Sequence, residues 1–295
     1  MTFVRSPQGL SNLYLFSNVD YVVFTEGGPS TFSVHEAARG EFNQAAGPDV
    51  HFWAQVFYHG RRDLRVHVRG LGSKTTLNEI AKLVESGDAS NICVAMDSDY
   101  SQIFDEKFKS KYILYTYGYS WENDLFEEEL LISVLDSIGA YSNDTSIIDM
   151  DISEAFSCAR RELLWLTYAD ILLFSARQSL FDRKKPESSI SDFHTIPRIQ
   201  KSRLKTLLKT RRTFIGKFRS CGKFQGISVE QHCPGKVLLL FTYRVMQYII
   251  KRYSKFPIPH KKYAVHLLFS HFYIQLASNH SSTKIQYYLE LTKTI

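Results

Sequence analysis

The pattern of apolar and polar positions divides the chain into two halves of different character. In the first half, short apolar runs alternate with helical patterns and turn signals. This alternation predicts an α/β core with a largely parallel sheet flanked by helices. The strands that we expect are 20–25, 51–58, 64–68, 92–96 and 112–116, the second and third forming a hairpin around residues 59–62. The helices that we expect are 32–42, led by a cap at Ser30, then 76–86 and one beginning at Trp121.

The second half carries longer helical patterns and no strand signal. Apolar residues recur at helical spacing, and Arg183–Ser189 is a polar, proline-containing break between two of the helices. The helices that we expect are 152–181, 199–224, 237–253 and 262–278. The change of pattern predicts two domains, 1–150 and 151–295, the second mainly α-helical and basic.

Charge is distributed as unevenly as hydrophobicity. The net charge is +6, but residues 1–150 hold 11 Lys and Arg against 21 Asp and Glu, whereas residues 151–295 hold 25 against 9. A nucleic-acid enzyme needs both an acidic and a basic region, since a cationic surface holds phosphates near an anionic, metal-loaded site. Charge runs also form ordinary solvated faces, so the asymmetry alone decides nothing.

The densest cationic stretch is 199–224, which contains nine Lys and Arg and no acid. It is the best nucleic-acid candidate outside the acidic motifs, because Lys and Arg supply the phosphate contacts that give affinity. The alternatives are a solubilising helix face or a dock for an acidic partner. The phosphate-contact candidates in it are Lys205, Lys209, Arg211 and Arg212.

Composition narrows the class of protein. Hydrophobic residues make up 44% of the 295 residues, so the chain folds into a globular protein. The start lacks a basic segment followed by an apolar run, and no apolar run is long enough to span a bilayer. The four cysteines are scattered without CxxC spacing. We therefore expect a cytoplasmic protein with free thiols.

Two acidic motifs close predicted strands. Glu26-Gly27 follows the first strand, and Asp97-Ser98-Asp99 follows the strand 92–96 about seventy residues later. Carboxylates are costly to bury, so acids at these positions indicate the carboxyl ends of strands, where an open parallel sheet binds its ligands. Three carboxylates gathered there suit Mg²⁺ or Mn²⁺. The pair of motifs indicates metal-assisted phosphoryl chemistry.

Each motif has a simpler interpretation when taken alone. An Asp-x-Asp pair is often a turn, and it also occurs in sugar-nucleotide transferases and haloacid-type phosphatases. A phosphatase of that type places its nucleophilic Asp at the first strand, whereas here Glu26-Gly27 comes first. Glu26 alone is also explained by the dipole of the following helix.

Taken together, the strand with Glu26-Gly27 and the later strand with Asp97-x-Asp99 resemble the Toprim domain of topoisomerases, primases and overcoming-lysogenization-defect nucleases. The resemblance covers roughly residues 18–140 and implies a compact α/β fold whose Glu and two Asp bind a divalent metal. The chain departs from the family at one point, because no acid follows Glu26-Gly27 closely.

Three further motifs narrow the resemblance. Ser120-x-Glu122-Asn123, Gly70-x-Gly72-Ser73-Lys74 and Pro234-Gly235-Lys236 resemble the Toprim-like effector nucleases of the PARIS anti-phage defence system. That resemblance implies a metal-dependent RNase that acts on tRNA and arrests the host. It also implies an ABC-type ATPase partner that sequesters the effector until infection, and a homodimeric active form.

These motifs add candidate residues. Glu122 is the fourth candidate acid, although Ser120 and Asn123 also fit a capping box that starts a helix without any chemistry. Lys74 and Lys236 are candidates for phosphate contacts, although exposed loop lysines are common.

The leading hypothesis is a Mg²⁺- or Mn²⁺-dependent endonuclease in which Glu26, Asp97, Asp99 and Glu122 hold one or two ions. Glu26 could equally serve as a general acid/base. A DNA-cutting Toprim nuclease and a non-catalytic module that binds metal or a partner are the rivals. The sequence contains no Gly-x-Ser-x-Gly elbow, no HExxH zinc motif and no Walker A motif, so ATP hydrolysis would belong to a partner.

Overall fold

The computed structural model describes residues 7–44, 47–140, 145–215 and 226–295, and the side chains of 7–8 and 211–215 are not described. The chain forms two compact units. The first comprises the chain up to Ser98, then Asp105–Tyr117 and Tyr273–Ile295; the second comprises Asp99–Phe104 and Gly118–Phe272. These units divide the chain at other points than residue 150, which lies inside a long helix.

The first unit is built on a four-stranded parallel sheet. Its strands are β1 (Tyr21–Thr25), β2 (Val66–Gly70), β3 (Ile92–Met96) and β4 (Ile113–Tyr115), in the order β2-β1-β3-β4. All three pairings are parallel. β1 and β3 are therefore the two central strands, and the predicted α/β core with a parallel sheet is confirmed.

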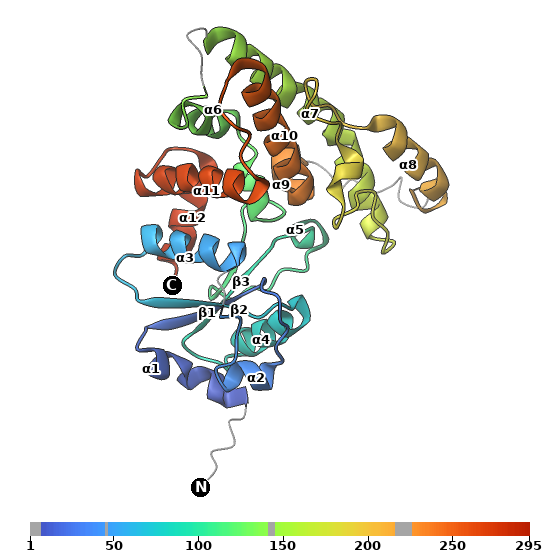
Figure 1. Cartoon of the computed structure of the whole chain (residues 1–295). Helices are drawn as coiled ribbons and strands as arrows, with labels where there is room; N and C mark the ends of the chain where they lie inside the picture. Colours follow the sequence, from blue (N-terminus) through green and yellow to red (C-terminus); the bar gives the residue numbers. More distant parts are fainter. Residues whose placement is uncertain (1–6, 45–46, 141–144, 216–225) are drawn as a thin grey trace. The chain divides into compact units, whose positions relative to one another are not determined.

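Helices cover both faces of this sheet (Figure 1). One face packs its apolar side chains against α1 (Leu13–Ser17), α2 (Val34–Ala38) and α4 (Lys74–Ser86). The other face carries α3 (Pro48–Gly60), against which α12 (Thr283–Lys293) packs. A short 3₁₀ helix, η1 (Pro7–Asn12), precedes α1. The sheet is buried on both sides, which explains why its strands are continuous apolar runs.

The predicted hairpin is wrong. Residues 51–58 belong to helix α3, and only the second of the two predicted strands forms, as β2. The buried residues of α3 follow one another at spacings of one, three and four residues, which places them on one face of a helix: Phe52, Trp53, Val56 and Phe57. Pro48 occupies the first helical turn, where its missing N–H costs nothing. The rings of Phe52 and Trp53 pack edge-on against Tyr288 of α12.

Caps set the ends of the other two helices in this half. Helix α2 is shorter than the predicted 32–42 and begins after Ser33 instead of Ser30, because Ser33 and Glu36 form a reciprocal capping box. Helix α4 begins two residues earlier than predicted, after Ser73, whose Oγ accepts the Thr76 N–H. It ends at Gly87, whose φ of 83° is the left-handed conformation that closes helices.

The second unit is mainly α-helical, and so is the described part of residues 151–295, for which the sequence predicted helices. Its long helices are α6 (Glu128–Ser137), α7 (Thr145–Phe174), α8 (Lys201–Ile215), α10 (Gly235–Tyr253) and α11 (Lys261–Ala277), which carries the chain back into the first unit. Its short elements are α5 (Ser101–Phe104), η2 (Trp121–Leu125), η3 (Pro186–Ser189) and α9 (Val229–His232).

Three predicted helices differ from those observed. The helix expected from Trp121 is the 3₁₀ turn η2 followed by α6, since Glu127 is extended between them. Helix α7 begins earlier than predicted and ends at Phe174. Helix α8 ends at Ile215, and the rest of the predicted 199–224 lies outside the described residues. None of the described helices is both long and apolar enough to cross a membrane. Cys93, Cys158 and Cys233 are free, and Cys221 is not described.

A buried carboxylate organises the second unit. Asp170 lies in α7 with no exposed surface, and it accepts hydrogen bonds from two hydroxyls, one guanidinium and two backbone amides of the segment that follows the helix. The donors are Tyr100 Oη at 2.7 Å, Arg183 Nη2 at 3.0 Å, Ser179 Oγ at 3.1 Å, Phe181 N at 3.3 Å and Leu180 N. Burial raises the pKa of Tyr100 well above its usual value, and the charge of Asp170 acts in the same direction. Asp170 therefore holds residues 179–183 against α7.

Replacing Asp170 with Asn should lower the free energy of unfolding by about 3 kcal/mol, because Arg183 and several buried donors lose an anionic acceptor. Urea denaturation followed by circular dichroism measures the change. Asp136→Asn on the exposed side of α6 is the matched control and should change the free energy by less than about 0.5 kcal/mol. Equal stability of the Asp170→Asn protein and the wild type would contradict this account of the network.

Candidate functional site

Glu26 and Asp97 lie at the same edge of the sheet. Glu26 is the first residue after β1, Asp97 is the first after β3, and these neighbouring strands pair in parallel with Thr25 opposite Ala95. Both side chains are half-buried, and Oε1 of Glu26 is shielded from solvent. The structure thus places Glu26 and Asp97 at one edge of the sheet, although the sequence separates the two motifs by about seventy residues.

This edge is also a topological switch point. After β1 the chain forms β2 on one side, and after β3 it forms β4 on the other. Connections that leave two adjacent strands in opposite directions open a crevice outside their carboxyl ends, which is where open α/β sheets bind ligands. Glu26 and Asp97 are the residues at that position.

The loop after Glu26 is held by Asn43. Gly27 and Gly28 have φ angles of 96° and 106°, which favour glycine, and a Cβ on Gly28 would lie 2.1 Å from Asn43 Nδ2. The buried Asn43 side chain donates to the carbonyls of Ser30 at 2.8 Å and Gly70 at 3.0 Å, and accepts the Ser30 N–H at 2.9 Å. One amide side chain therefore ties the loop to the end of β2.

The glycine-rich segment after β2 packs against the same loop. Gly72 N donates to the carbonyl of Gly27 at 2.9 Å, and Leu71 N donates to that of Thr25 at 3.0 Å. The segment ends in Lys74, the exposed first residue of the thirteen-residue helix α4. Two motifs that the sequence separates by more than forty residues are thus adjacent, and the amino end of α4 follows directly from this edge.

Asp49 is an acid that the sequence analysis missed. It lies in the first turn of α3, and a Cβ on Gly27 would lie 2.4 Å from its Oδ2. The carboxylate of Asp49 therefore sits against the Glu26-Gly27 turn. The local signal was Gly47-Pro48-Asp49, a typical helix start, but the segment after it was assigned to a strand.

Hydrogen bonds to Thr116 fix the middle residue of the Asp97-x-Asp99 motif. Ser98 is buried; its N–H donates to Thr116 Oγ1 at 3.0 Å and its Oγ donates to the Thr116 carbonyl at 2.6 Å. Asp99 follows with a φ of 45°, a left-handed conformation that Asp tolerates better than most residues. Asp99 belongs to the second unit, where its N–H donates to the Tyr119 carbonyl at 2.8 Å.

Glu122 lies in a tightly packed turn of the second unit. Ser120 and Asn123 form the capping box that the sequence also allowed, and Ser120 Oγ donates to Glu122 Oε2 at 2.5 Å. Asn123 Nδ2 donates to the carbonyls of Glu230 and Cys233, each at 2.9 Å. The turn therefore has a clear structural role, and Glu122 is a buried acid within it.

The Pro234-Gly235-Lys236 motif meets this turn. Gly235 begins α10, and a Cβ there would lie 2.2 Å from Ser120 Oγ and 2.6 Å from Asn123 Oδ1. Only a residue without a side chain lets the helix approach so closely. Lys236 is the next residue and is exposed.

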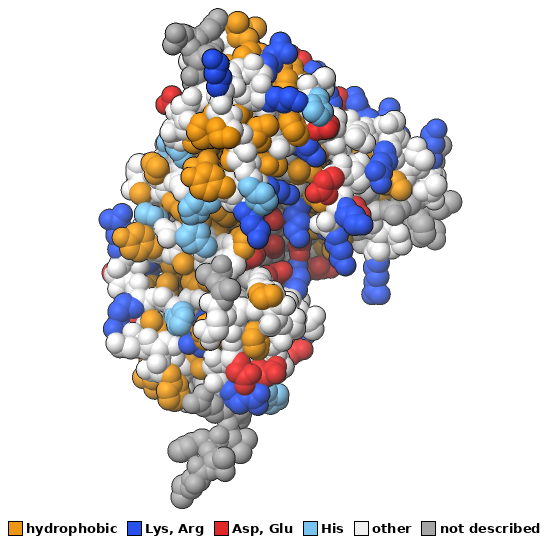
Figure 2. All heavy atoms as spheres, viewed as in Figure 1, with side chains coloured by type: hydrophobic (Ala, Val, Ile, Leu, Met, Phe, Trp, Pro, Cys, Tyr) orange, Lys and Arg blue, Asp and Glu red, His pale blue; other side chains and the backbone are white. Residues whose placement is uncertain are grey.

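The predicted cations of α8 are exposed as far as the structure describes them. Lys205 and Lys209 lie on the surface of the helix, and Figure 2 shows Lys and Arg side chains over this end of the second unit. Arg211 and Arg212 lie in the helix, but their side chains are outside the described residues. Lys201 is neutralised by Glu162, 2.7 Å away.

The described residues contain no group of three or more His, Cys, Asp and Glu placed to hold a metal ion. Two carboxylates at one edge are compatible with the usual coordination of Mg²⁺, which keeps several waters and is bound by one or two carboxylates together with substrate phosphates. The amino end of a helix and a lysine beside them suit a phosphate. The arrangement can bind a hydrated divalent cation and a phosphate side by side.

Comparison with models of protein families gives no match for this chain, and a search of curated proteins gives none either.

Replacing Asn43 with Ala should lower the free energy of unfolding by about 2 kcal/mol, because the buried carbonyl of Gly70 and the part-buried backbone groups of Ser30 lose their partner. Gly28→Ala should also be destabilising, and its cost should be smaller in the Asn43→Ala protein, where the obstructing side chain is gone. Urea denaturation of the four proteins measures the coupling. Gln44→Ala, an exposed neighbour, is the control; additive effects of Gly28→Ala and Asn43→Ala would contradict the proposed contact.

Proposed function

We propose that this protein is a divalent-metal-dependent endonuclease of the Toprim type that cleaves RNA. The observation that carries the proposal is the position of Glu26 and Asp97 at the carboxyl ends of the two central strands, at the switch point of a parallel sheet. The order of the two motifs along the chain, with Glu-Gly first, favours a Toprim nuclease over the other enzymes that use an Asp-x-Asp pair.

Glu26 and Asp97 are the proposed ligands at the sheet edge, for Mg²⁺ or Mn²⁺. Asp99 and Glu122 are further ligand candidates from the sequence. A bound divalent ion would polarise the scissile phosphate, lower the pKa of an attacking water and stabilise the leaving oxygen. Asp49 lies beside Gly27, and the negative charge of its carboxylate would favour binding of a cation at this edge.

The chain's own groups would position the substrate. Lys74 and the first N–H groups of α4 supply positive charge beside the loop that follows Glu26, and such helix ends bind phosphates. Asn43 keeps that loop in place through its bonds to Ser30 and Gly70. Lys236 and the exposed lysines of α8, Lys205 and Lys209, are the remaining phosphate-contact candidates, together with Arg211 and Arg212 of the same helix.

The biological setting is proposed from the sequence resemblance alone. The motifs around Glu26, Asp97 and Glu122 resemble AriB, the effector of the PARIS defence system. On that basis we propose that tRNA is the substrate, that an ABC-type ATPase of the AriA kind sequesters the protein until infection, and that the active form is a homodimer.

Glu26→Gln and Asp97→Asn should each lower metal-dependent cleavage by about a hundredfold or more, because each removes one anionic oxygen donor while keeping the shape of the side chain. The assay incubates purified protein, freed of any partner, with tRNA and with plasmid DNA, in Mg²⁺ or Mn²⁺ and in EDTA. Glu79→Gln, an exposed acid on α4, is the matched control and should cleave like the wild type.

The dependence of cleavage on Mn²⁺ concentration separates two roles of Glu26. If it is a ligand, high Mn²⁺ should partly restore cleavage by Glu26→Gln; a general base would not be restored in this way. Cleavage of tRNA by the folded Glu26→Gln protein at the wild-type rate in Mg²⁺ would show the site to be wrong. A product from DNA alone would favour the DNA-cutting rival, and no product from either substrate would favour the binding module.

A further inference from the structure

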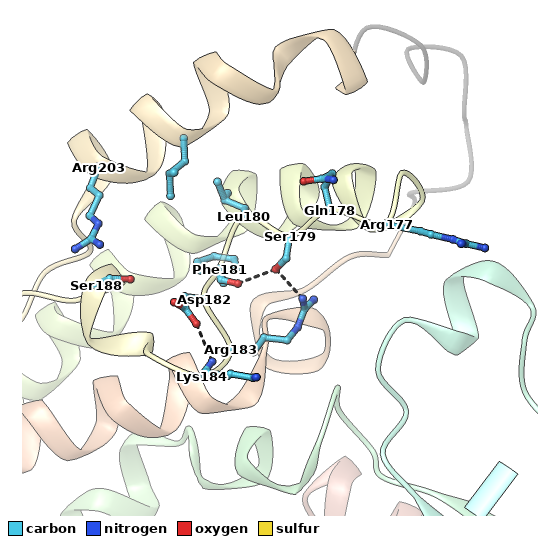
Figure 3. A pocket seen from close by; sticks show the side chains of 11 residues that line it. Arg177, Gln178, Ser179, Leu180, Phe181, Asp182, Arg183, Lys184, Ser188 and Arg203 are labelled. Carbon is cyan, nitrogen blue, oxygen red and sulfur yellow. Dashed lines mark hydrogen bonds between the residues drawn. The ribbon is translucent and has the colours of Figure 1, made fainter. Parts of the chain in front are cut away.

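A cavity of about 510 Å³ opens in the second unit, lined in part by the cationic helix α8 and by none of the acids at the sheet edge. It lies between α8, the segment that follows α7, and η3 (Figure 3). All of its lining residues belong to the second unit, between Arg177 and Leu207. The cavity is within the size range of sites that hold one small organic ligand.

Among the charged residues of the lining, cations outnumber acids by four to one. Arg183, Lys184 and Arg203 line the cavity from two different segments, and Figure 3 shows Arg203 reaching from α8 toward Ser188. Arg177 is at the rim, and its side chain extends away from the others in the same view. The single acid of the lining, Asp182, already accepts the backbone N–H groups of Lys184 at 2.9 Å and Lys185 at 3.0 Å.

Arg183 is held in place before any ligand arrives. Its guanidinium donates to Asp170 Oδ2 at 3.0 Å, Ser179 Oγ at 2.6 Å and Tyr119 Oη at 2.8 Å. These bonds use three of its five N–H groups. The network around Asp170 thus fixes an arginine at the wall of the cavity.

Arg203 and Lys184 differ from nearby cations in their ion pairing. Lys201 is paired with Glu162 at 2.7 Å, and Arg198 with Glu154 at 2.5 Å. Within the described part of the chain, by contrast, no acid forms an ion pair with Arg203 or Lys184. The charge of Lys184 still interacts with Asp182 of the same lining, so Arg203 is the cation of the lining that is most available to an anionic ligand.

The cavity is not only cationic. Leu180 and Phe181 contribute buried apolar side chains, and Leu207 faces it from α8 one turn after Arg203. Ser179 and Ser188 add hydroxyls. Apolar surface beside a group of cations matches a molecule with a flat organic part and a phosphate.

We propose that this cavity binds a nucleotide, with Arg203, Lys184 and Arg183 as the contacts to its phosphate. The nucleotide is either a free mononucleotide or one unit of an RNA strand. The proposal is independent of the metal-dependent cleavage proposed above, since it involves none of the acids at the sheet edge.

The test is calorimetric titration in EDTA, which prevents metal-dependent cleavage, with AMP, adenosine and an adenosine tetranucleotide that has no terminal phosphate. The proteins are the wild type, Arg203→Gln, Lys184→Gln and the matched control Arg161→Gln, which removes an exposed arginine of α7 outside the cavity. Arg183 is left intact because its substitution would disturb the Asp170 network. Thermal melting confirms that each variant is folded.

We expect AMP to bind at least tenfold more tightly than adenosine, and Arg203→Gln and Lys184→Gln each to weaken AMP about tenfold, while Arg161→Gln does not. A tetranucleotide that binds more tightly than AMP and is weakened by the same two variants identifies the RNA strand as the source. A tetranucleotide no tighter than AMP identifies the free mononucleotide. Binding that is equal in all four proteins, or no binding of either phosphate ligand, would overturn the proposal.

Discussion

The parallel pairing of β1 with β3 is the constraint on which the candidate site depends. It places Glu26 and Asp97 on the same edge even though seventy-one residues separate them in the chain. Because the next connections lead to opposite sides, the space beyond these strand ends is not closed by a crossover. Asn43 then holds the loop after Glu26 against β2, and Gly72 holds the amino end of α4 beside it. Two acids, a helix end and a lysine are thereby positioned by backbone geometry.

In the second unit, buried polar groups fix the positions of neighbouring segments, as the parallel sheet does in the first unit. Asp170 gathers Tyr100, Ser179 and Arg183, and so fixes the segment that walls the cationic cavity. Asn123 and Gly235 bring the turn that contains Glu122 against α9 and α10. A low-dielectric interior makes each of these groups costly to leave unsatisfied, so the networks specify one arrangement of the helices. The hydrogen bonds of Asp170 that stabilise this unit therefore also fix the position of the Arg183 guanidinium at the cavity.

Where the fold differs from the sequence predictions, contacts between distant segments are the cause. Residues 51–58 are rich in aromatic residues and were predicted as a strand, but α12, more than two hundred residues away, offers α3 an apolar partner. The turn at Trp121 had a helix-start signature, yet Glu127 is extended and divides the segment into η2 and α6. Asp49 and Asn43 were not recognised as parts of the site, since their importance depends on contacts with Gly27 and Gly28 and not on any local motif.

The sequence by itself determined the central strands, most of the helices and the two acids at the strand ends. These follow from local propensity and from the period of the apolar positions, which neighbouring residues set. The tertiary structure alone decided which strands are adjacent, that the carboxyl-terminal helix returns to the first unit, and that Arg183 and Arg203 line one cavity while Lys201 is neutralised. Such outcomes depend on packing between distant segments, where the partner of a charge or an apolar face is chosen by the whole fold.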